Sequence, residues 1–152
     1  FTALSAGALV VDDYKYELNA NKIDFVVSQL PDCNGDKNLI NQVFSNLVGN
    51  AIKFLVPERP GLISVSGLNT KDYVKYTVSD NGMGIHPDHQ EKVFDMFHKL
   101  NPGKPGSGLG MNIIKQIVER HKGKVELEST PDKGTKVHVY LLKPNKIPKH
   151  KS

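Results

Sequence analysis

Residues 36–55 read DKNLINQVFSNLVGNAIKFL, and this stretch decides the fold. Its apolar residues recur at spacings of three and four, which is the periodicity of one buried helix face. Asp36 follows the turn at Asn34-Gly35 and suits a helix start, and Pro57 ends the pattern. We therefore predict a long amphipathic helix over residues 36–55.

The rest of the chain alternates predicted helices with predicted strands. The other predicted helices are residues 9–20 and 109–121. The predicted strands, in chain order, are residues 23–30, 62–68, 73–79, 124–129 and 135–142. Because helices and strands interleave and antiparallel hairpins occur, the sequence predicts an α+β sandwich with helices on one face of a mixed sheet.

The 152 residues have an ordinary globular composition, with 38% apolar and 24% charged residues. We expect residues 1–8 to be the end of an upstream linker, 9–142 one domain and 143–152 a basic, solvated tail. No apolar run approaches the roughly 20 residues that a membrane-spanning helix needs, so we expect a soluble domain. The first residue, Phe1, indicates a fragment of a longer protein.

The net charge of +4 comes entirely from the tail. Lys143, Lys146, Lys149 and Lys151 are four of 20 basic residues, and the remaining 16 balance 16 acidic residues. A neutral body with a basic tail lacks the footprint of a nucleic-acid-binding domain. The one cysteine, Cys33, cannot form an internal disulfide, which favours a reducing compartment, and we interpret its thiol as inert.

A polar stripe runs along the helix predicted over residues 36–55. Gln42, Asn46, Asn50 and Lys53 fall within about an 80° arc at 100° per residue. Amide oxygens are good ligands for Mg²⁺, and a lysine supplies a point charge for phosphate. The same residues also suit the solvent side of any helix, so periodicity alone leaves both interpretations open.

A second candidate, residues 80–85, follows a predicted strand and reads Asp-Asn-Gly-Met-Gly-Ile. A carboxylate at a strand end can accept a hydrogen bond from the exocyclic amine of adenine. Two glycines let the backbone pass close to a flat base. An acid followed by Gly-x-Gly is also common in turns, so this motif alone is weak.

A third candidate is the glycine-rich segment 103–111, which leads into a predicted helix whose N-terminus can receive phosphate. Its spacing fits neither the Walker pattern nor the dinucleotide fingerprint. Phe94 and Phe97, just before it, are most simply one face of a short helix. His86 and His89 have a spacing that suggests a metal, but we expect a solvated loop there because no third ligand is near in sequence.

Taken together, four segments resemble a known family. Residues 46–54, 80–84, 94–97 and 106–110 resemble, in order and spacing, the N, G1, F and G2 boxes of the catalytic ATP-binding domain of sensor histidine kinases. The resemblance covers residues 9–142. It implies a Bergerat-type fold, in which about three helices cover one face of a mixed, mostly antiparallel sheet and a flexible lid closes over ATP.

The resemblance also implies roles for single residues. Asn50 would coordinate Mg²⁺ with support from Asn46, Lys53 would lie near the phosphates, and Asp80 would bind the adenine amine. The nucleotide pocket and the lid would also include Gly82, Met83, Gly84, Ile85, Phe94, Phe97, Gly106, Ser107, Gly108, Leu109 and Gly110. Lys99 would join Asn46 and Lys53 in assisting the chemistry. It stands where many members carry arginine, so it keeps the charge and loses the bidentate fork.

The function implied is transfer of the ATP γ-phosphoryl group to a histidine. None of the six histidines lies in the acidic helical context of the family's phosphoacceptor, so we expect the acceptor on an upstream dimerization domain. Hydrolytic relatives of this fold carry glutamate at the position of Asn46, and an amide is a poor base, so we expect little ATPase activity. The alternative is a non-catalytic nucleotide-sensing or partner-binding module on the same fold.

The resemblance implies partners and a location as well. We expect a response-regulator receiver domain to be a partner, and nucleic acid not to be one. The fragment is expected to be monomeric and the full-length protein a homodimer. This domain is expected in the cytoplasm, whether or not the full-length protein is anchored in a membrane.

Overall fold

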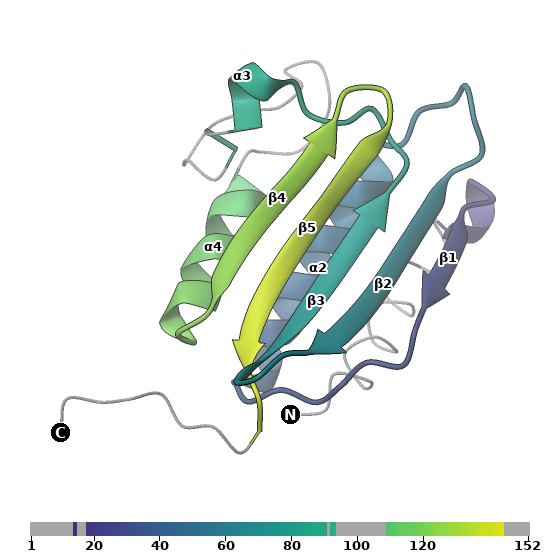
Figure 1. The fold of residues 1–152 in the computed structure, drawn as a ribbon. Helices are drawn as coiled ribbons and strands as arrows, with labels where there is room; N and C mark the ends of the chain where they lie inside the picture. The colour runs from purple at the N-terminus through teal and green to yellow at the C-terminus, as the bar shows by residue number, and fades with distance from the viewer. Residues whose placement is uncertain (1–13, 15–17, 91, 94–108, 145–152) are drawn as a thin grey trace, which may run out of the picture.

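The computed structural model describes Tyr14 and residues 18–90, 92–93 and 109–144 (Figure 1). Tyr14 and residues 18–20 are helical, in agreement with part of the helix predicted over 9–20. The predicted linker and most of the predicted tail lie outside the described residues. So do six predicted site residues, which are Phe94, Phe97, Lys99, Gly106, Ser107 and Gly108.

Within the described residues, five strands form one sheet in the order β1-β2-β3-β5-β4. Their bounds are Asp24–Val27 for β1, Leu62–Asn69 for β2, Tyr73–Asp80 for β3, Lys124–Thr130 for β4 and Gly134–Leu142 for β5. β1 pairs with β2 in parallel, and the other three pairs are antiparallel. The predicted mixed, mostly antiparallel sheet is therefore confirmed.

Two long helices, α2 (Lys37–Lys53) and α4 (Leu109–Arg120), lie side by side against one face of this sheet (Figure 1). Asp36 caps α2, because its carboxylate accepts a hydrogen bond from the amide of Leu39 at 3.0 Å. The predicted helix over residues 36–55 is confirmed with nearly the expected bounds. No helix in the described part of the chain has the length and apolar character that crossing a bilayer requires.

The hydrophobic core lies between these helices and the sheet. α2 buries every third or fourth side chain, as its pattern predicts, and these are Ile40, Val43, Phe44, Leu47, Val48 and Ala51. Phe44 packs edge-on against Tyr76 of β3, with ring centroids 5.2 Å apart. Cys33 is also fully buried, and burial raises the pKa of its thiol, which agrees with the inert role predicted for it.

A short helix, α3 (Pro87–Gln90), replaces the loop predicted around His86 and His89, whereas the exposure of residues 86–88 agrees with the predicted solvation. Proline suits the first turn of a helix, and the side chain of His86 accepts a hydrogen bond from the amide of Asp88 at 3.1 Å. Gln90 then donates to the carbonyls of Ile85 and Ser129, which ties α3 to β4. Hydrophobic periodicity does not reveal such side-chain contacts.

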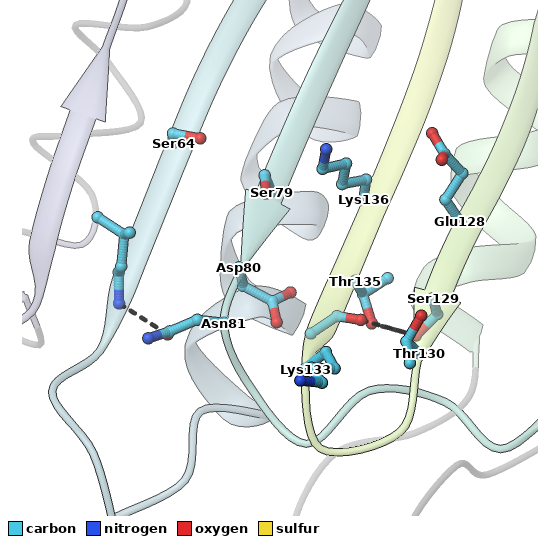
Figure 2. A pocket seen from close by; sticks show the side chains of 12 residues that line it. Ser64, Ser79, Asp80, Asn81, Glu128, Ser129, Thr130, Lys133, Thr135 and Lys136 are labelled. Atoms are coloured by element: carbon cyan, nitrogen blue, oxygen red, sulfur yellow. Dashed lines mark hydrogen bonds between the residues drawn. The ribbon is translucent and has the colours of Figure 1, made fainter.

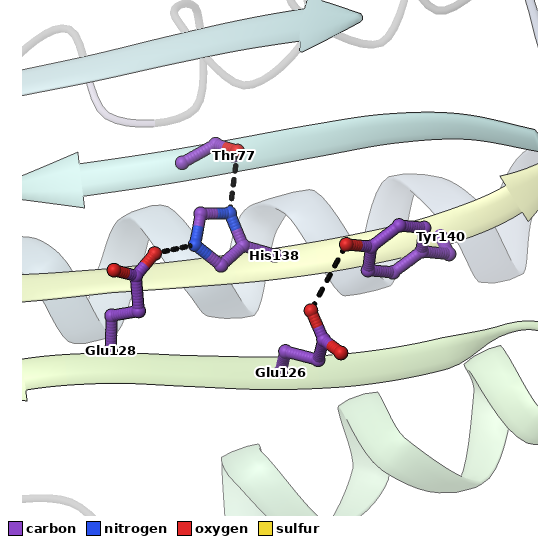
Figure 3. Close-up of polar contacts among 5 residues, drawn as sticks. All are labelled: Thr77, Glu126, Glu128, His138 and Tyr140. Carbon is purple, nitrogen blue, oxygen red and sulfur yellow. Dashed lines mark hydrogen bonds and ion pairs between the residues drawn. The ribbon is translucent and has the colours of Figure 1, made fainter. Parts of the chain in front are cut away.

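The face of the sheet that points away from α2 and α4 is polar. His138 of β5 is only 6% exposed there, and its Nδ1 lies 2.8 Å from the hydroxyl of Thr77 on β3 (Figure 3). Its Nε2 is hydrogen-bonded to the carboxylate of Glu128 on β4. Tyr140 donates to Glu126 at 3.0 Å in the same way. Cross-strand hydrogen bonds therefore fasten β4 and β3 to β5.

Candidate functional site

A cavity lies between α2, α4 and the sheet, close to the end of β3. Of the residues that the structure describes, three polar ones line it, Asn50, Asp80 and Thr135. Its apolar lining consists of Leu47, Ala51, Phe54, Val78, Ile85, Met111, Leu127 and Val137. An apolar lining with a few convergent polar groups is typical of small-molecule sites, whereas the volume of this cavity, about 30 Å³, is far smaller than theirs.

Asp80 is the last residue of β3 and brings a carboxyl group to this cavity. Its Oδ1 accepts a hydrogen bond from the main-chain amide of Gly82 at 2.8 Å. Burial raises the pKa of Asp80 from its ordinary value to about 6, and main-chain hydrogen bonds from Gly82 and Thr135 oppose that rise. A partly desolvated carboxylate of this kind gains by accepting a hydrogen bond from a ligand.

The two glycines after Asp80 are required by close backbone approaches. A Cβ on Gly82 would lie 2.2 Å from the carbonyl oxygen of Phe54, at the end of α2. A Cβ on Gly84 would lie 2.2 Å from the carbonyl oxygen of Thr130, and Gly84 has a φ of 73°. The turn is therefore held between α2 and the β4–β5 turn, and Met83 donates to Phe54 at 2.8 Å.

The polar stripe of α2 has only one member in the cavity. Asn50 lines it, and its Nδ2 donates to the sulfur of Met111 on α4 at 3.2 Å. Because the nitrogen of the amide is held by α4, the oxygen at its other end is the group that can ligate a cation. Asn46 is partly buried and Gln42 is exposed, on the turns of α2 before Asn50.

Lys53 lies in a different place from the predicted pocket. It is exposed at the end of α2 and lines a wider groove beside the loop over residues 54–61. Its long side chain still starts one turn from Asn50. The structure therefore brings together Asn50, Asp80 and Ile85 in one cavity and leaves Asn46 and Lys53 outside its lining.

A second pocket, which also takes in Asp80 and Thr135, lies at the same end of the sheet (Figure 2). The side chain of Asn81 accepts a hydrogen bond there from the amide of Leu62 at 2.9 Å. The hydroxyls of Ser129 and Thr135 lie 2.8 Å apart. The residues that line this second pocket are mostly polar, so it suits water better than a base. We interpret it as part of the surroundings that hold Asp80 in place.

Sequence reasoning missed four groups that the structure adds to the candidate site. Thr135 lies directly opposite Asp80 in the β3–β5 register, and its role depends on strand pairing that no motif encodes. Met111 is the last residue of the glycine-rich segment 103–111, and Phe54 caps the C-terminus of α2, but neither was singled out as a site residue. Leu127 comes from β4, and only its alternating burial pattern could have pointed to it.

Comparison with known proteins identifies the class of this domain. Residues 35–145 match the family described as Histidine kinase-, DNA gyrase B-, and HSP90-like ATPase. This match covers well over half of the chain, and the chain belongs to this family. Within it, the domain is an ATP-binding catalytic domain of the histidine-kinase type, as the following relatives indicate.

Two curated relatives are sensory kinases. The methanogenesis regulatory histidine kinase FilI of Methanothrix harundinacea is 35% identical over 109 residues, which are 72% of this chain and 12% of that protein. The adaptive-response sensory kinase SasA of Trichormus variabilis is 34% identical over 131 residues, which are 84% of this chain and 32% of that protein. The chain therefore spans less than a third of the length of these relatives.

Solved structures agree with this assignment. The catalytic domain of histidine kinase ThkA has a TM-score of 0.81 and 25% identity, with 94% of this chain and 95% of that chain covered. The mycobacterial sensor histidine kinase MprB has a TM-score of 0.74 and 26% identity, with 90% and 95% covered. The predicted fold and the predicted family are both confirmed.

Proposed function

We propose that this domain binds ATP in the cavity at Asp80 and transfers the γ-phosphoryl group to a histidine on a dimerization domain of the full-length protein. The observation that carries the proposal is the half-buried carboxyl group of Asp80 in an apolar cavity of a histidine-kinase-type domain. The kinases among the relatives favour this function over a non-catalytic module.

Adenine recognition follows from the chemistry of this cavity. Val78, Ile85 and Leu127 offer apolar surface to a flat base, and Asp80 accepts a hydrogen bond from the exocyclic amine. Gly82 and Gly84 keep the neighbouring backbone close to Asp80. Met83 and Ile85 complete the turn on which the base rests. A base that lacks the amine would leave the carboxylate without its donor, so the site selects adenine.

The phosphates would extend from the base along α2. We assign Asn50 as the one protein ligand of Mg²⁺, because its amide oxygen is a hard donor and its nitrogen is held by Met111. Asn46 supports this residue from the preceding turn, and Lys53 and Lys99 supply positive charge for the phosphates. Mg²⁺, when bound, neutralises phosphate charge. A site with one protein ligand suits Mg²⁺, which keeps several waters and binds substrate phosphates.

The start of α4 would meet the phosphates from the other side. Gly106, Ser107 and Gly108 precede it in the chain, and Leu109 and Gly110 are its first residues. Amides at a helix N-terminus favour an anion, and we assign this segment to phosphate binding and to the lid. Phe94 and Phe97 are assigned to the seat of the lid.

The residues available favour transfer over hydrolysis. Phosphoryl transfer depends on positioning and charge stabilisation, whereas hydrolysis also needs a group that orients water. Asn46 carries an amide where a basic carboxylate would serve hydrolysis. We therefore propose a histidine of the full-length protein as acceptor and a receiver domain as the subsequent partner. We also propose a cytoplasmic location, where ATP is available, and a full-length homodimer.

Thermal unfolding with a non-hydrolysable ATP analogue and Mg²⁺ tests the binding part of this proposal. At a ligand concentration of about 100 times Kd, binding adds about 2.7 kcal/mol and raises the midpoint by several degrees. Asp80→Asn should remove most of the shift. Asn50→Ala should remove its dependence on Mg²⁺. A wild-type midpoint that saturating nucleotide leaves unchanged would overturn the proposal.

Phosphohistidine formation in the full-length protein tests the transfer step. Radiolabel from the γ-position of ATP should appear as an acid-labile, base-stable adduct in wild type and be lost in Asn50→Ala. Steady release of free phosphate without a protein adduct would assign the domain to hydrolysis instead.

A further inference from the structure

Arg59, in the loop between α2 and β2, makes three hydrogen bonds to main-chain carbonyls. Its Nε donates to the carbonyl of Asn81 at 2.8 Å. Its Nη2 donates to the carbonyl of Gly82 at 2.7 Å and to that of Asp132 at 2.7 Å. One side chain therefore joins three loops that are distant in sequence.

A guanidinium group suits this place for a chemical reason. It is planar, stays charged at any physiological pH and presents several donors in a fixed arrangement. Charged donors form stronger bonds to carbonyls than neutral donors do. A lysine ammonium at the end of a flexible chain lacks the planar fork, so it cannot reproduce this three-way contact.

The peptide groups that Arg59 holds belong to the turn that supports Asp80. The carbonyl of Gly82 accepts a hydrogen bond from Arg59, and the amide of Gly82 donates one to the Asp80 carboxylate at 2.8 Å. Gly82 is buried, and the Phe54 carbonyl leaves no room for a Cβ on it. A displacement of this peptide would therefore move the Gly82 amide, which donates the hydrogen bond to the Asp80 carboxylate.

The third hydrogen bond of Arg59, to the carbonyl of Asp132, reaches the turn between β4 and β5. Asp132 lies in the β4–β5 turn with a φ of 65°, and its amide donates to the carbonyl of Met83 at 2.8 Å. In the same turn, a Cβ on Gly134 would lie 2.0 Å from the carbonyl oxygen of Asp80. Arg59 thus ties the β4–β5 turn to Asn81 and Gly82, and the same turn also contacts the residues after Asp80 through the bond from Asp132 to Met83.

We infer that Arg59 is a positioning residue for the base pocket, which sets the place of the Asp80 carboxylate and with it the preference for adenine. It acts through the backbone of Asn81 and Gly82. The inference rests on the proposed function, because it takes Asp80 as the acceptor of the adenine amine. Its removal should weaken nucleotide binding, although none of the cavity-lining side chains is altered.

The test compares ADP with IDP, which carries a carbonyl in place of the exocyclic amine. Calorimetric titration gives both affinities for wild type, Arg59→Met and Arg59→Lys, at a temperature at which each variant is folded. We expect Arg59→Met to weaken the affinity for ADP by about 10-fold and the affinity for IDP much less, so that the ratio of the two affinities falls. Arg59→Lys should lie between wild type and Arg59→Met.

Arg120 provides a matched control, since it is the second of the chain's two arginines and is exposed in the last turn of α4. Arg120→Met should leave both affinities unchanged. Arg59→Met added to Asp80→Asn should produce no further fall in the ratio, because the two residues act on one hydrogen bond. Should Arg59→Met fail to fold, Arg59→Lys alone decides the result.

The outcomes separate this inference from the function on which it rests. If wild type binds neither nucleotide, the proposed function fails. If wild type prefers ADP and Asp80→Asn loses that preference while Arg59→Met and Arg59→Lys keep it, only the role of Arg59 is overturned. If Arg59→Met lowers the midpoint of unfolding but leaves the ratio of the ADP and IDP affinities unchanged, Arg59 is likewise a structural residue only.

Discussion

The main-chain amide of Asp36 donates to Nε2 of His121 at 3.1 Å, so that the residue before α2 and the residue after α4 are joined directly. Nδ1 of the same ring lies 2.8 Å from the carbonyl of Ile117, which can only accept. In this arrangement Nε2 accepts a hydrogen bond and Nδ1 donates one. This contact fixes the two helices that bound the candidate nucleotide cavity.

Replacement of His121 should consequently destabilise the domain. His121→Ala removes the side-chain partner of the Asp36 amide and one of the two donors to the Ile117 carbonyl, and we expect the free energy of unfolding to fall by about 1–2 kcal/mol. Urea unfolding at neutral pH measures this change. His86→Ala, at an exposed histidine before α3, is the control and should cost less. Equal losses in the two variants would remove the special role of His121.

The helices and strands of this domain were predictable because each has a strong local pattern. The spacing of Ile40, Val43, Phe44 and Leu47 alone predicts a helix with one buried face. Both hairpins follow from alternating strands around polar turns. The resemblance then added the family, which periodicity cannot supply, whereas the order of the strands came from the structure.

The contacts that complete the site were not predictable in the same way. Arg59 reads as one charged residue in a loop, and its three carbonyl partners come from segments 22 to 73 residues away. Thr135 reaches Asp80 only through strand pairing. His121 looks like a basic residue at a helix end, a position that is favourable for charge, whereas in the structure its Nε2 accepts a hydrogen bond from the amide of Asp36. Such contacts depend on tertiary structure.

Gly82→Ala should disrupt the site through its backbone. The added Cβ would lie 2.2 Å from the Phe54 carbonyl oxygen, and no flexible side chain is there to move aside. We expect a loss of about 3 kcal/mol in the free energy of unfolding, because the end of α2 or the turn must shift. Nucleotide binding should be lost with it. Urea unfolding and calorimetric titration with ADP measure the two effects.

Gly49→Ala is the matched control for this substitution. Gly49 lies within α2, and its Cβ would meet the hydroxyl of Tyr14 at 2.5 Å, which is the far end of a side chain. Alanine favours a helix, and the gain of about 0.5–1 kcal/mol offsets a weakened bond from Tyr14 to Ser45. Stability should therefore change by less than about 1 kcal/mol. If Gly82→Ala changes the free energy of unfolding as little as Gly49→Ala does, the close approach between Gly82 and the Phe54 carbonyl is wrong.

Nucleotide affinity should fall in mild acid because of Asp80. Its carboxyl group has a pKa of about 6 in the folded domain without ligand, whereas the adenine amine needs the ionised form as acceptor. Binding therefore has to deprotonate a growing fraction of the protein as the pH falls below 6. We expect affinity to be about 10-fold weaker at pH 5 than at pH 7, as measured by calorimetric titration.

The pH dependence of folding stability that Asp80 causes has the opposite sign to that of nucleotide affinity. A raised pKa means that ionisation of Asp80 disfavours the folded state, so the cost is absent below the ordinary value of 3.8 and complete above about 6. Asp80→Asn should remove this part of the pH dependence. It also serves as the control for binding, since any slope that it keeps comes from the nucleotide phosphates. Identical slopes in wild type and Asp80→Asn would exclude Asp80 as the titrating group.

The His138 ring should lower the pKa of Glu128 on the polar face of the sheet. The hydrogen bond from His138 is the main cause of this lowering, whereas the lowered pKa of Glu126 comes chiefly from Tyr140. A lowered pKa stabilises the folded state above the ordinary value of 4.5, and this contribution is lost as the pH falls through the folded value.

NMR titration of the two glutamate carboxyl carbons tests this assignment in wild type and His138→Phe. Phenylalanine fills the space of the buried ring and removes both of its nitrogens. The pKa of Glu128 should rise toward its ordinary value in the variant, because its main hydrogen-bond donor is gone. Glu126 is the internal control and should keep most of its lowered pKa through Tyr140. If Glu128 titrates alike in both proteins, lysines such as Lys136 lower its pKa instead.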